Sequence, residues 1–190
     1  MLWTIPNLLT LLRVGLIPVL VFVYYLPISG LYVAGVFLLA GLTDWLDGFL
    51  ARTLAQTSRF GEFLDPVADK LMVAVVLILV VSDDMLVSKL FSSQLFTVVT
   101  AVVVGREIAV SALREWMAEL GNRGRVAVGF GGKIKTTSQF IAISLLLMGP
   151  EVEGFPVLIC GELLFYVAGG LTLWSMVVYL KAAWPDLRDH

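Results

Sequence analysis

The chain has 190 residues, of which 59% are hydrophobic and only 15% are charged, and its formal net charge at pH 7 is −2. Its mean hydropathy of +0.94 means more apolar surface than a soluble domain of this length can bury. The composition excludes an ordinary soluble domain and predicts an all-α, polytopic membrane protein with a single domain over residues 1–190. No nucleic-acid partner is expected. The lone Cys160 excludes a disulfide within the chain.

Six transmembrane helices are expected, because about 20 apolar residues are needed to cross the hydrocarbon. No small-residue cleavage site follows the first apolar run, so this helix is expected to be retained. In chain order the helices are expected over residues 6–25, 31–55, 61–81, 91–120, 134–148 and 155–181. The connections after the first, third and fifth helices hold a single basic residue, Lys89, whereas the opposite side is rich in Lys and Arg. The positive-inside rule therefore predicts that both termini are cytoplasmic.

The second, third and fifth helices have uninterrupted apolar runs that are too short to span a bilayer alone, so their cytoplasmic halves must continue through polar residues. Lipid does not accept such residues. They are expected to face a water-accessible cavity lined by protein.

Four aspartates stand in these polar halves: Asp44, Asp47, Asp65 and Asp69. The helices that carry them are joined by a tight turn, so they are expected to be antiparallel neighbours with all four carboxylates at similar depth. Clustered carboxylates need cations, and oxygen ligands favour Mg²⁺, Mn²⁺ or Ca²⁺. Two such ions would suit phosphoryl displacement. The alternative is that the aspartates only form salt bridges with Arg52, Arg59, Lys70 and the basic loop.

Gly48 and Arg52 follow the first two aspartates on the same helix. Glycine lets a ligand lie flat against the helix, and arginine pairs with phosphate. The whole pattern, Asp44-x2-Asp47-Gly48-x2-Ala51-Arg52-x8-Gly61-x3-Asp65-x3-Asp69, resembles the signature of the CDP-alcohol phosphotransferase family.

This resemblance implies CDP-linked lipid chemistry in a bacterial cytoplasmic membrane, six helices, a homodimer, and two divalent cations, Mg²⁺ or Mn²⁺. It implies that Asp44, Asp47 and Asp65 are metal ligands and that Asp69 is both ligand and general base. It also implies that Gly48 and Arg52 contact the CDP moiety of CDP-diacylglycerol, with Ser58 adding a hydrogen bond.

The start of the chain places Asn7, Thr10 and Arg13 at intervals of three residues near the cytoplasmic end of the first helix. By family resemblance, Asn7 and Thr10 are expected beside the cytidine diphosphate. Thr43, which comes just before Asp44, is expected to reach the diphosphate too. The alternative is a helix cap, a tolerated hydroxyl and an arginine that only sets topology.

A basic half follows. Arg106 and Arg114 lie eight residues apart, and Lys133 and Lys135 stand around the start of the fifth helix, whose amides also favour anions. Together these residues are expected to bind the phosphate of the acceptor, or else to set topology and touch anionic lipid.

The runs TIPNLLTLLRVGLIP and SALREWMAE resemble the branch of the family that uses sn-glycerol 3-phosphate. The expected reaction is therefore transfer of a phosphatidyl group from CDP-diacylglycerol to that acceptor, with release of CMP. One rival is a sister enzyme that uses inositol phosphate, serine or phosphatidylglycerol. The other rival is a divalent-cation transporter.

Overall fold

The computed structural model describes residues 4–53, 59–121, 130–149, 152 and 156–188, and the regular structure in these ranges is helical throughout, with no strand. The helices are α1 (Ile5–Tyr24), α2 (Gly30–Thr53), α3 (Arg59–Ser82), α4 (Asp84–Val87), α5 (Ser93–Glu119), α6 (Phe130–Met148) and α7 (Val157–Arg188). Each expected helix is present, and the all-α class is confirmed.

Two boundaries differ from the prediction by four residues or more, and one helix was not predicted. Helix α6 begins at Phe130, so Lys133 and Lys135 lie inside the helix and not around its start, where they were expected. Helix α7 continues to Arg188, because Ala183 in its last turns is fully buried against α5 and extends the packing there. The four-residue α4 was not predicted. Asp83 is its N-cap residue, and the Asp83 carboxylate accepts a hydrogen bond from the Leu86 amide at 3.0 Å.

Four helices in the described part of the chain are long and apolar enough to cross a membrane: Ile5–Tyr24, Gly30–Leu50, Ser93–Glu119 and Val157–Pro185. A shorter apolar helix covers Ile134–Met148. Large apolar side chains are exposed along these helices, among them Phe22, Leu163 and Trp174. A water-soluble protein does not expose so much apolar surface, so the chain is an integral membrane protein.

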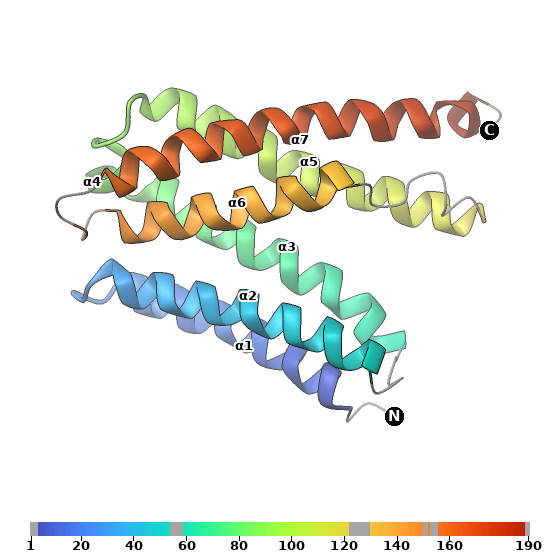
Figure 1. Cartoon of the computed structure of the whole chain (residues 1–190), viewed down its shortest axis with the longest axis horizontal. Coiled ribbons are helices and arrows are strands. Elements are labelled where there is room, and N and C mark those ends of the chain that lie inside the picture. Colours follow the sequence, from blue (N-terminus) through green and yellow to red (C-terminus); the bar gives the residue numbers. More distant parts are fainter. Residues whose placement is uncertain (1–3, 54–58, 122–129, 150–151, 153–155, 189–190) are drawn as a thin grey trace.

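The helices form two layers joined by α3 (Figure 1). Helices α1 and α2 pack together in one layer, and α5, α6 and α7 form the other. Helix α3 runs obliquely from one layer to the other and packs against α1 and α5. Helix α1 begins and α7 ends at the same end of the molecule, where α2 also ends and α3 begins (Figure 1).

Aromatic pairs fill the core between the layers. The rings of Phe37 and Phe140 stack with their centroids 4.7 Å apart, and those of Phe96 and Phe165 lie 5.0 Å apart. A glycine on α2 makes room for the first pair: a Cβ at Gly41 would overlap the Phe140 ring. The paired rings hold α2 against α6 and α5 against α7.

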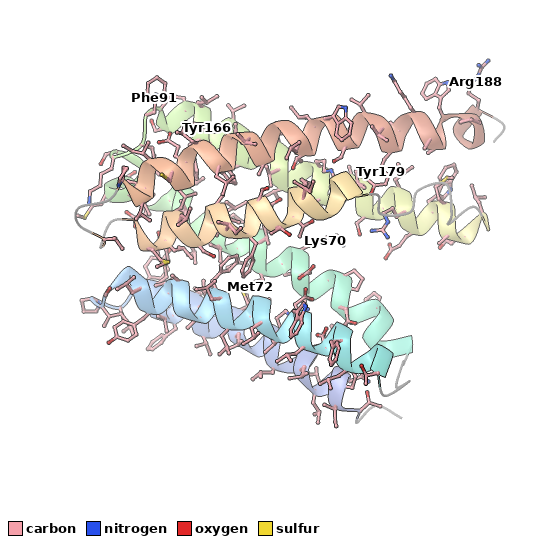
Figure 2. All side chains as sticks on the ribbon, in the orientation of Figure 1. Lys70, Met72, Phe91, Tyr166, Tyr179 and Arg188 are labelled. Carbon is pink, nitrogen blue, oxygen red and sulfur yellow. The ribbon has the colours of Figure 1, made fainter. Side chains whose placement is uncertain are left out.

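A buried carboxylate ties the helix ends together on the side opposite the aspartates. Glu162 of α7 is 4% exposed. It accepts hydrogen bonds from the Phe91 amide, at 3.1 Å, and from the Tyr166 hydroxyl, at 2.6 Å. Figure 2 shows Phe91 and Tyr166 near the start of α7, well away from Lys70 and Tyr179. This end is a structural anchor for α5 and α7.

Candidate active site

A cavity of about 680 Å³ lies between the two layers and is lined by side chains from α1, α2, α3, α5, α6 and α7. Three of the aspartates and three of the basic residues singled out in the sequence line it: Asp44, Asp65, Asp69, Arg106, Arg114 and Lys135. Apolar residues such as Phe37 and Phe140 form the rest of its wall. The fold thus brings the aspartate signature and the basic half to one cavity, as a protein-lined polar site requires.

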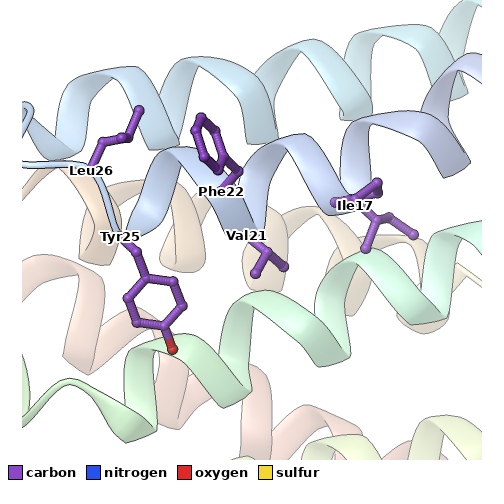
Figure 3. Close-up of a pocket in the computed structure, with 6 residues that line it drawn as sticks. Ile17, Val21, Phe22, Tyr25 and Leu26 are labelled. Atoms are coloured by element: carbon purple, nitrogen blue, oxygen red, sulfur yellow. The ribbon is translucent and has the colours of Figure 1, made fainter.

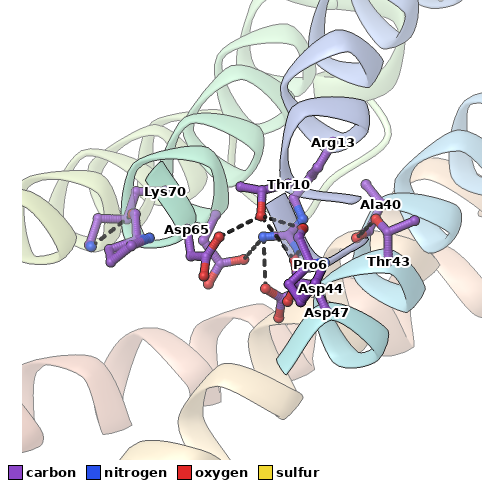
Figure 4. A network of polar contacts seen from close by, with 11 residues as sticks. Pro6, Thr10, Arg13, Ala40, Thr43, Asp44, Asp47, Asp65 and Lys70 are labelled. Carbon is purple, nitrogen blue, oxygen red and sulfur yellow. Dashed lines mark hydrogen bonds and ion pairs between the residues drawn. The ribbon is translucent and has the colours of Figure 1, made fainter. Parts of the chain in front are cut away.

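Arg13 lies at the centre of the aspartate cluster (Figure 4). It is the largest fully buried side chain in the described part of the chain, with 1% exposed. Its Nη1 is 2.8 Å from Asp44 Oδ1 and 4.0 Å from Asp69 Oδ1, and its Nη2 pairs with Asp47 Oδ2. The sequence offered only a topological role for this arginine, so its central position is new information from the tertiary structure.

Thr10, one turn before Arg13 on α1, contacts the remaining aspartate. Its Oγ1 is 2.5 Å from Asp65 Oδ1, 3.1 Å from the Pro6 carbonyl and 3.5 Å from Asp47 Oδ2. Since the hydroxyl has one hydrogen to donate, Asp65 at the shortest distance is the favoured acceptor. Helix α1 therefore supplies polar partners to aspartates of both α2 and α3.

Helices α2 and α3 were expected to pack directly against each other along their length, and in the structure they do so only slightly. The two helices make far less contact with each other than each makes with α1, and α3 diverges from α2 as it leaves their common end (Figure 1). A short connection fixes proximity only at the ends that it joins. Farther along, α1 occupies the space between the helices, and the four carboxylates meet across its side chains.

Among the described residues, Lys70 forms no direct ion pair with an aspartate of the cluster. Its Nζ donates to the Pro66 carbonyl of its own helix at 2.9 Å. The side chains of Arg52 and Arg59, the other partners considered from the sequence, lie outside the described residues. The ion pairs that the structure does show join Asp44 and Asp47 to Arg13, a residue that the salt-bridge alternative did not include.

Four of the six residues expected to bind CDP-diacylglycerol lie on α1 and α2 at positions where the structure describes the whole residue, namely Asn7, Thr10, Thr43 and Gly48. Asn7 is buried near the start of α1. Thr43 is also buried, and its hydroxyl donates to the Ala40 carbonyl at 2.7 Å. Gly48 lies in α2 one residue after Asp47, and Arg52 lies in the same helix. Ser58 is outside the described residues.

The basic half is centred on Arg106 and Lys135, both buried, whereas Arg114 is exposed on the cavity wall. Arg106 Nη2 donates to Ser175 Oγ at 2.7 Å, and its guanidinium lies 5.6 Å from the centre of the Tyr179 ring. These contacts hold Arg106 firmly in place. Lys133 lies in the first turns of α6, but its side chain is outside the described part.

Glu107 is a cavity residue that the sequence analysis missed. Its Oε1 pairs with Lys135 Nζ and lies 3.2 Å from Arg106 Nη1. Only a weak indication of this role was present in the sequence, namely an acidic residue inside an otherwise basic segment. Its position means that a carboxylate of the chain itself already lies against two of the four expected phosphate-binding residues.

The aspartate cluster fits hard divalent cations in its chemistry, since carboxylate oxygens are the ligands that Mg²⁺ and Mn²⁺ prefer. Among the described residues, however, no three acidic, His or Cys side chains are gathered closely enough to hold a metal ion. Arg13 lies between Asp44 and Asp47 and occupies oxygens of both. The carboxylates are therefore suitable metal ligands, but two of their oxygens already contact the guanidinium of Arg13.

A second cavity, of about 620 Å³, lies along α1 and the residues that follow it (Figure 3). Its lining is Ile17, Pro18, Val21, Phe22, Tyr25 and Leu26. None of these side chains is charged, and the Tyr25 hydroxyl is the single polar group among them.

Comparison with known proteins agrees with the aspartate signature. A family model described as CDP-alcohol phosphatidyltransferase matches residues 3–180. The chain belongs to the CDP-alcohol phosphatidyltransferase family, which confirms the family and the enzyme class expected from the sequence.

Within this family the chain is similar along its whole length to enzymes named CDP-diacylglycerol–glycerol-3-phosphate 3-phosphatidyltransferase. Those from Escherichia coli K12, Shigella sonnei Ss046 and Shigella flexneri serotype 5b are each 50% identical over 190 residues, which is 99% of this chain and 99% of theirs. The similarity therefore covers both the aspartate cluster and the basic half.

Proposed function

We propose that the protein transfers the phosphatidyl group of CDP-diacylglycerol to sn-glycerol 3-phosphate, giving phosphatidylglycerol phosphate and CMP. The observation that carries this proposal is the shared cavity, in which the family's aspartates face the buried cations Arg106 and Lys135. A second phosphate site is what a phosphorylated acceptor needs. The printed names of relatives that are 50% identical support the same acceptor.

The donor binds at the aspartate end. Asp44, Asp47, Asp65 and Asp69 hold two divalent cations, Mg²⁺ or Mn²⁺, which supply charge neutralisation for the diphosphate and the departing CMP. Gly48 and Arg52 on α2 contact the CDP moiety, together with Asn7, Thr10, Thr43 and Ser58. The close approach of a ligand to α2 needs a residue without a side chain, and Gly48 provides it.

Asp69 acts as the general base. Its side chain is 54% accessible and lines the cavity, whereas that of Asp47 is 5% accessible behind Arg13. Asp69 takes the proton from the 1-hydroxyl of glycerol 3-phosphate. The hydroxyl oxygen forms a bond to the lipid-bearing phosphorus, and the bond from that phosphorus to the CMP oxygen breaks, so that CMP leaves with the electron pair.

The acceptor phosphate binds at the basic end. Arg106 is fixed by Ser175 and Tyr179, and Lys135 is held near it by Glu107. A dianionic phosphate is a stronger partner for these cations than one carboxylate. It competes with Glu107 for Lys135, with Arg114 and Lys133 adding positive charge at the rim.

The setting of the enzyme is a bacterial cytoplasmic membrane, with six spans, one domain over residues 1–190, cytoplasmic termini and a cytoplasm-facing active site. The excess of Lys and Arg on the side of the two termini supports this orientation. The protein acts as a homodimer, as the family resemblance implies.

The test is CMP release by purified protein with Mg²⁺ or Mn²⁺, CDP-diacylglycerol and a panel of acceptors. CMP should be released with sn-glycerol 3-phosphate, and Asp69→Asn should lower the rate at least about 100-fold, as loss of a general base does. Turnover only with inositol phosphate or serine would remove the acceptor assignment. If no acceptor gives CMP release and the protein instead takes up Mn²⁺ into proteoliposomes, the enzyme assignment is wrong and the protein is a transporter.

A further inference from the structure

Arg13 is a charged side chain in the candidate site to which the sequence assigned only a topological role and the proposed chemistry none. It pairs with Asp44 and Asp47 and lies 4.0 Å from Asp69, while being 1% exposed. A buried arginine is costly unless carboxylates pair with it, and buried carboxylates are costly unless a cation pairs with them. The two groups therefore stabilise each other within the bundle.

Arg13 uses the very oxygens that a metal ion would need. Its two terminal nitrogens contact Asp44 Oδ1 and Asp47 Oδ2, which belong to the proposed metal ligands. A carboxylate oxygen that contacts a guanidinium is less available to a divalent ion, and two cations among the same carboxylates repel each other. Arginine and metal ions must therefore compete for this pair of aspartates.

The pairing of Arg13 is also incomplete. Among the described residues, its Nε has no hydrogen-bond partner, and Nη1 contacts Asp44 without the alignment of a hydrogen bond. Arg13 lines the cavity as well, so a guanidinium that leaves the carboxylates moves into the protein-lined cavity and not into lipid. An exchange of partners here is less costly than breaking a fully satisfied buried pair.

We propose that Arg13 is a resident counter-ion of the active site. It neutralises Asp44 and Asp47 when divalent ions are scarce and gives them up when metal binds, so it sets the divalent-ion concentration at which the site fills. The inference rests on the metal-binding role proposed above for the aspartates. Arg13 is thus a positioning residue that acts through the carboxylates.

The test compares Arg13→Gln and Arg13→Lys with the wild type, using the full chain in detergent without lipid substrate. Lys89→Gln, which removes one exposed positive charge in the connection between α4 and α5, is the matched control. Mn²⁺ binding is measured by electron paramagnetic resonance of the free ion. Thermal unfolding is followed in EDTA and at increasing MnCl₂.

Arg13→Gln should unfold at a lower temperature than the wild type in EDTA, because it leaves the buried Asp47 carboxylate and the partly exposed Asp44 carboxylate without their cation. It should also reach half-saturation at an Mn²⁺ concentration about tenfold lower, since one competing charge-assisted contact is gone. Mn²⁺ should restore its unfolding temperature. Arg13→Lys keeps the charge but not the two-nitrogen fork, so its half-saturation should fall between the two, and Lys89→Gln should match the wild type.

Weaker or unchanged Mn²⁺ binding in folded Arg13→Gln would overturn the proposal, because it would mean that Arg13 organises the ligands and does not compete for them. If Arg13→Gln does not fold, Arg13→Lys decides by the same criterion. Failure of both to fold even in Mn²⁺ would also overturn it, since the metal should replace the missing charge. Binding is measured without CDP-diacylglycerol, so a wrong substrate assignment leaves this result unaffected.

Discussion

Lys135 offers the sharpest test of the acceptor site. It is 3% exposed, and its Nζ contacts Glu107, whose Oε1 also lies 3.2 Å from Arg106. Arg106 has further partners in Ser175 and Tyr179. Lys135 has fewer contacts to give up when it binds a phosphate. Lys135→Met keeps the length and apolar body of the side chain and removes only the charge. It should raise KM for sn-glycerol 3-phosphate and leave kcat nearly unchanged.

The size of the effect follows from the contact that is lost. A hydrogen bond to a charged group contributes about 1.5–3 kcal/mol, which corresponds to a rise of about 10- to 150-fold in KM. The KM for CDP-diacylglycerol should not change, because that substrate lies at the aspartate end of the cavity. The assay is CMP release at saturating CDP-diacylglycerol over a range of acceptor concentrations, with the exposed Lys181→Met as control.

The removal of Lys135 also leaves Glu107 with one cation fewer, and that alone can disturb the cavity. The double variant Lys135→Met with Glu107→Gln separates the two causes. If Lys135 binds the acceptor phosphate, the double variant keeps the raised KM. If Lys135 only neutralises Glu107, removing both restores the wild-type KM. Restoration, or a fall in kcat at unchanged KM, would refute the acceptor site as described.

Three further outcomes are expected. Glu162→Ala should lower the free energy of unfolding by about 1–3 kcal/mol, because it leaves the Phe91 amide without its acceptor, while kcat stays unchanged; a large loss of activity in the folded variant would contradict a purely structural role. Gly161→Ala should cost about 1–3 kcal/mol, since its Cβ would lie 2.9 Å from the Leu146 amide nitrogen of α6; chemical denaturation in mild detergent measures it. In a chain without other cysteines, a cysteine in place of Lys89 should react with an impermeant maleimide in spheroplasts whose cytoplasmic membrane is intact. A cysteine near the end of α7 should react only after that membrane is opened. The reverse pattern would invert the proposed topology.

The sequence alone determined the helices and the family. Apolar runs of fixed length leave few alternatives to helices in a membrane protein, because backbone polar groups must be satisfied within each segment. The boundaries that it missed, at Phe130 and Arg188, lie where glycines or packing against α5 decide how far a helix continues. The aspartate signature is equally local, because spacing along α2 and α3 fixes which side chains share a face.

The tertiary structure decided what those aspartates meet. The spacing placed Asp44 and Asp69 on their helices but gave no sign that α1 would fill the space between α2 and α3. Only the packing brings Arg13 among the carboxylates and Glu107 onto Lys135. The physical reason is that burial and charge pairing depend on which helices are neighbours. That is settled by the shape of the whole bundle, whereas a residue's position along its own helix is settled by the sequence.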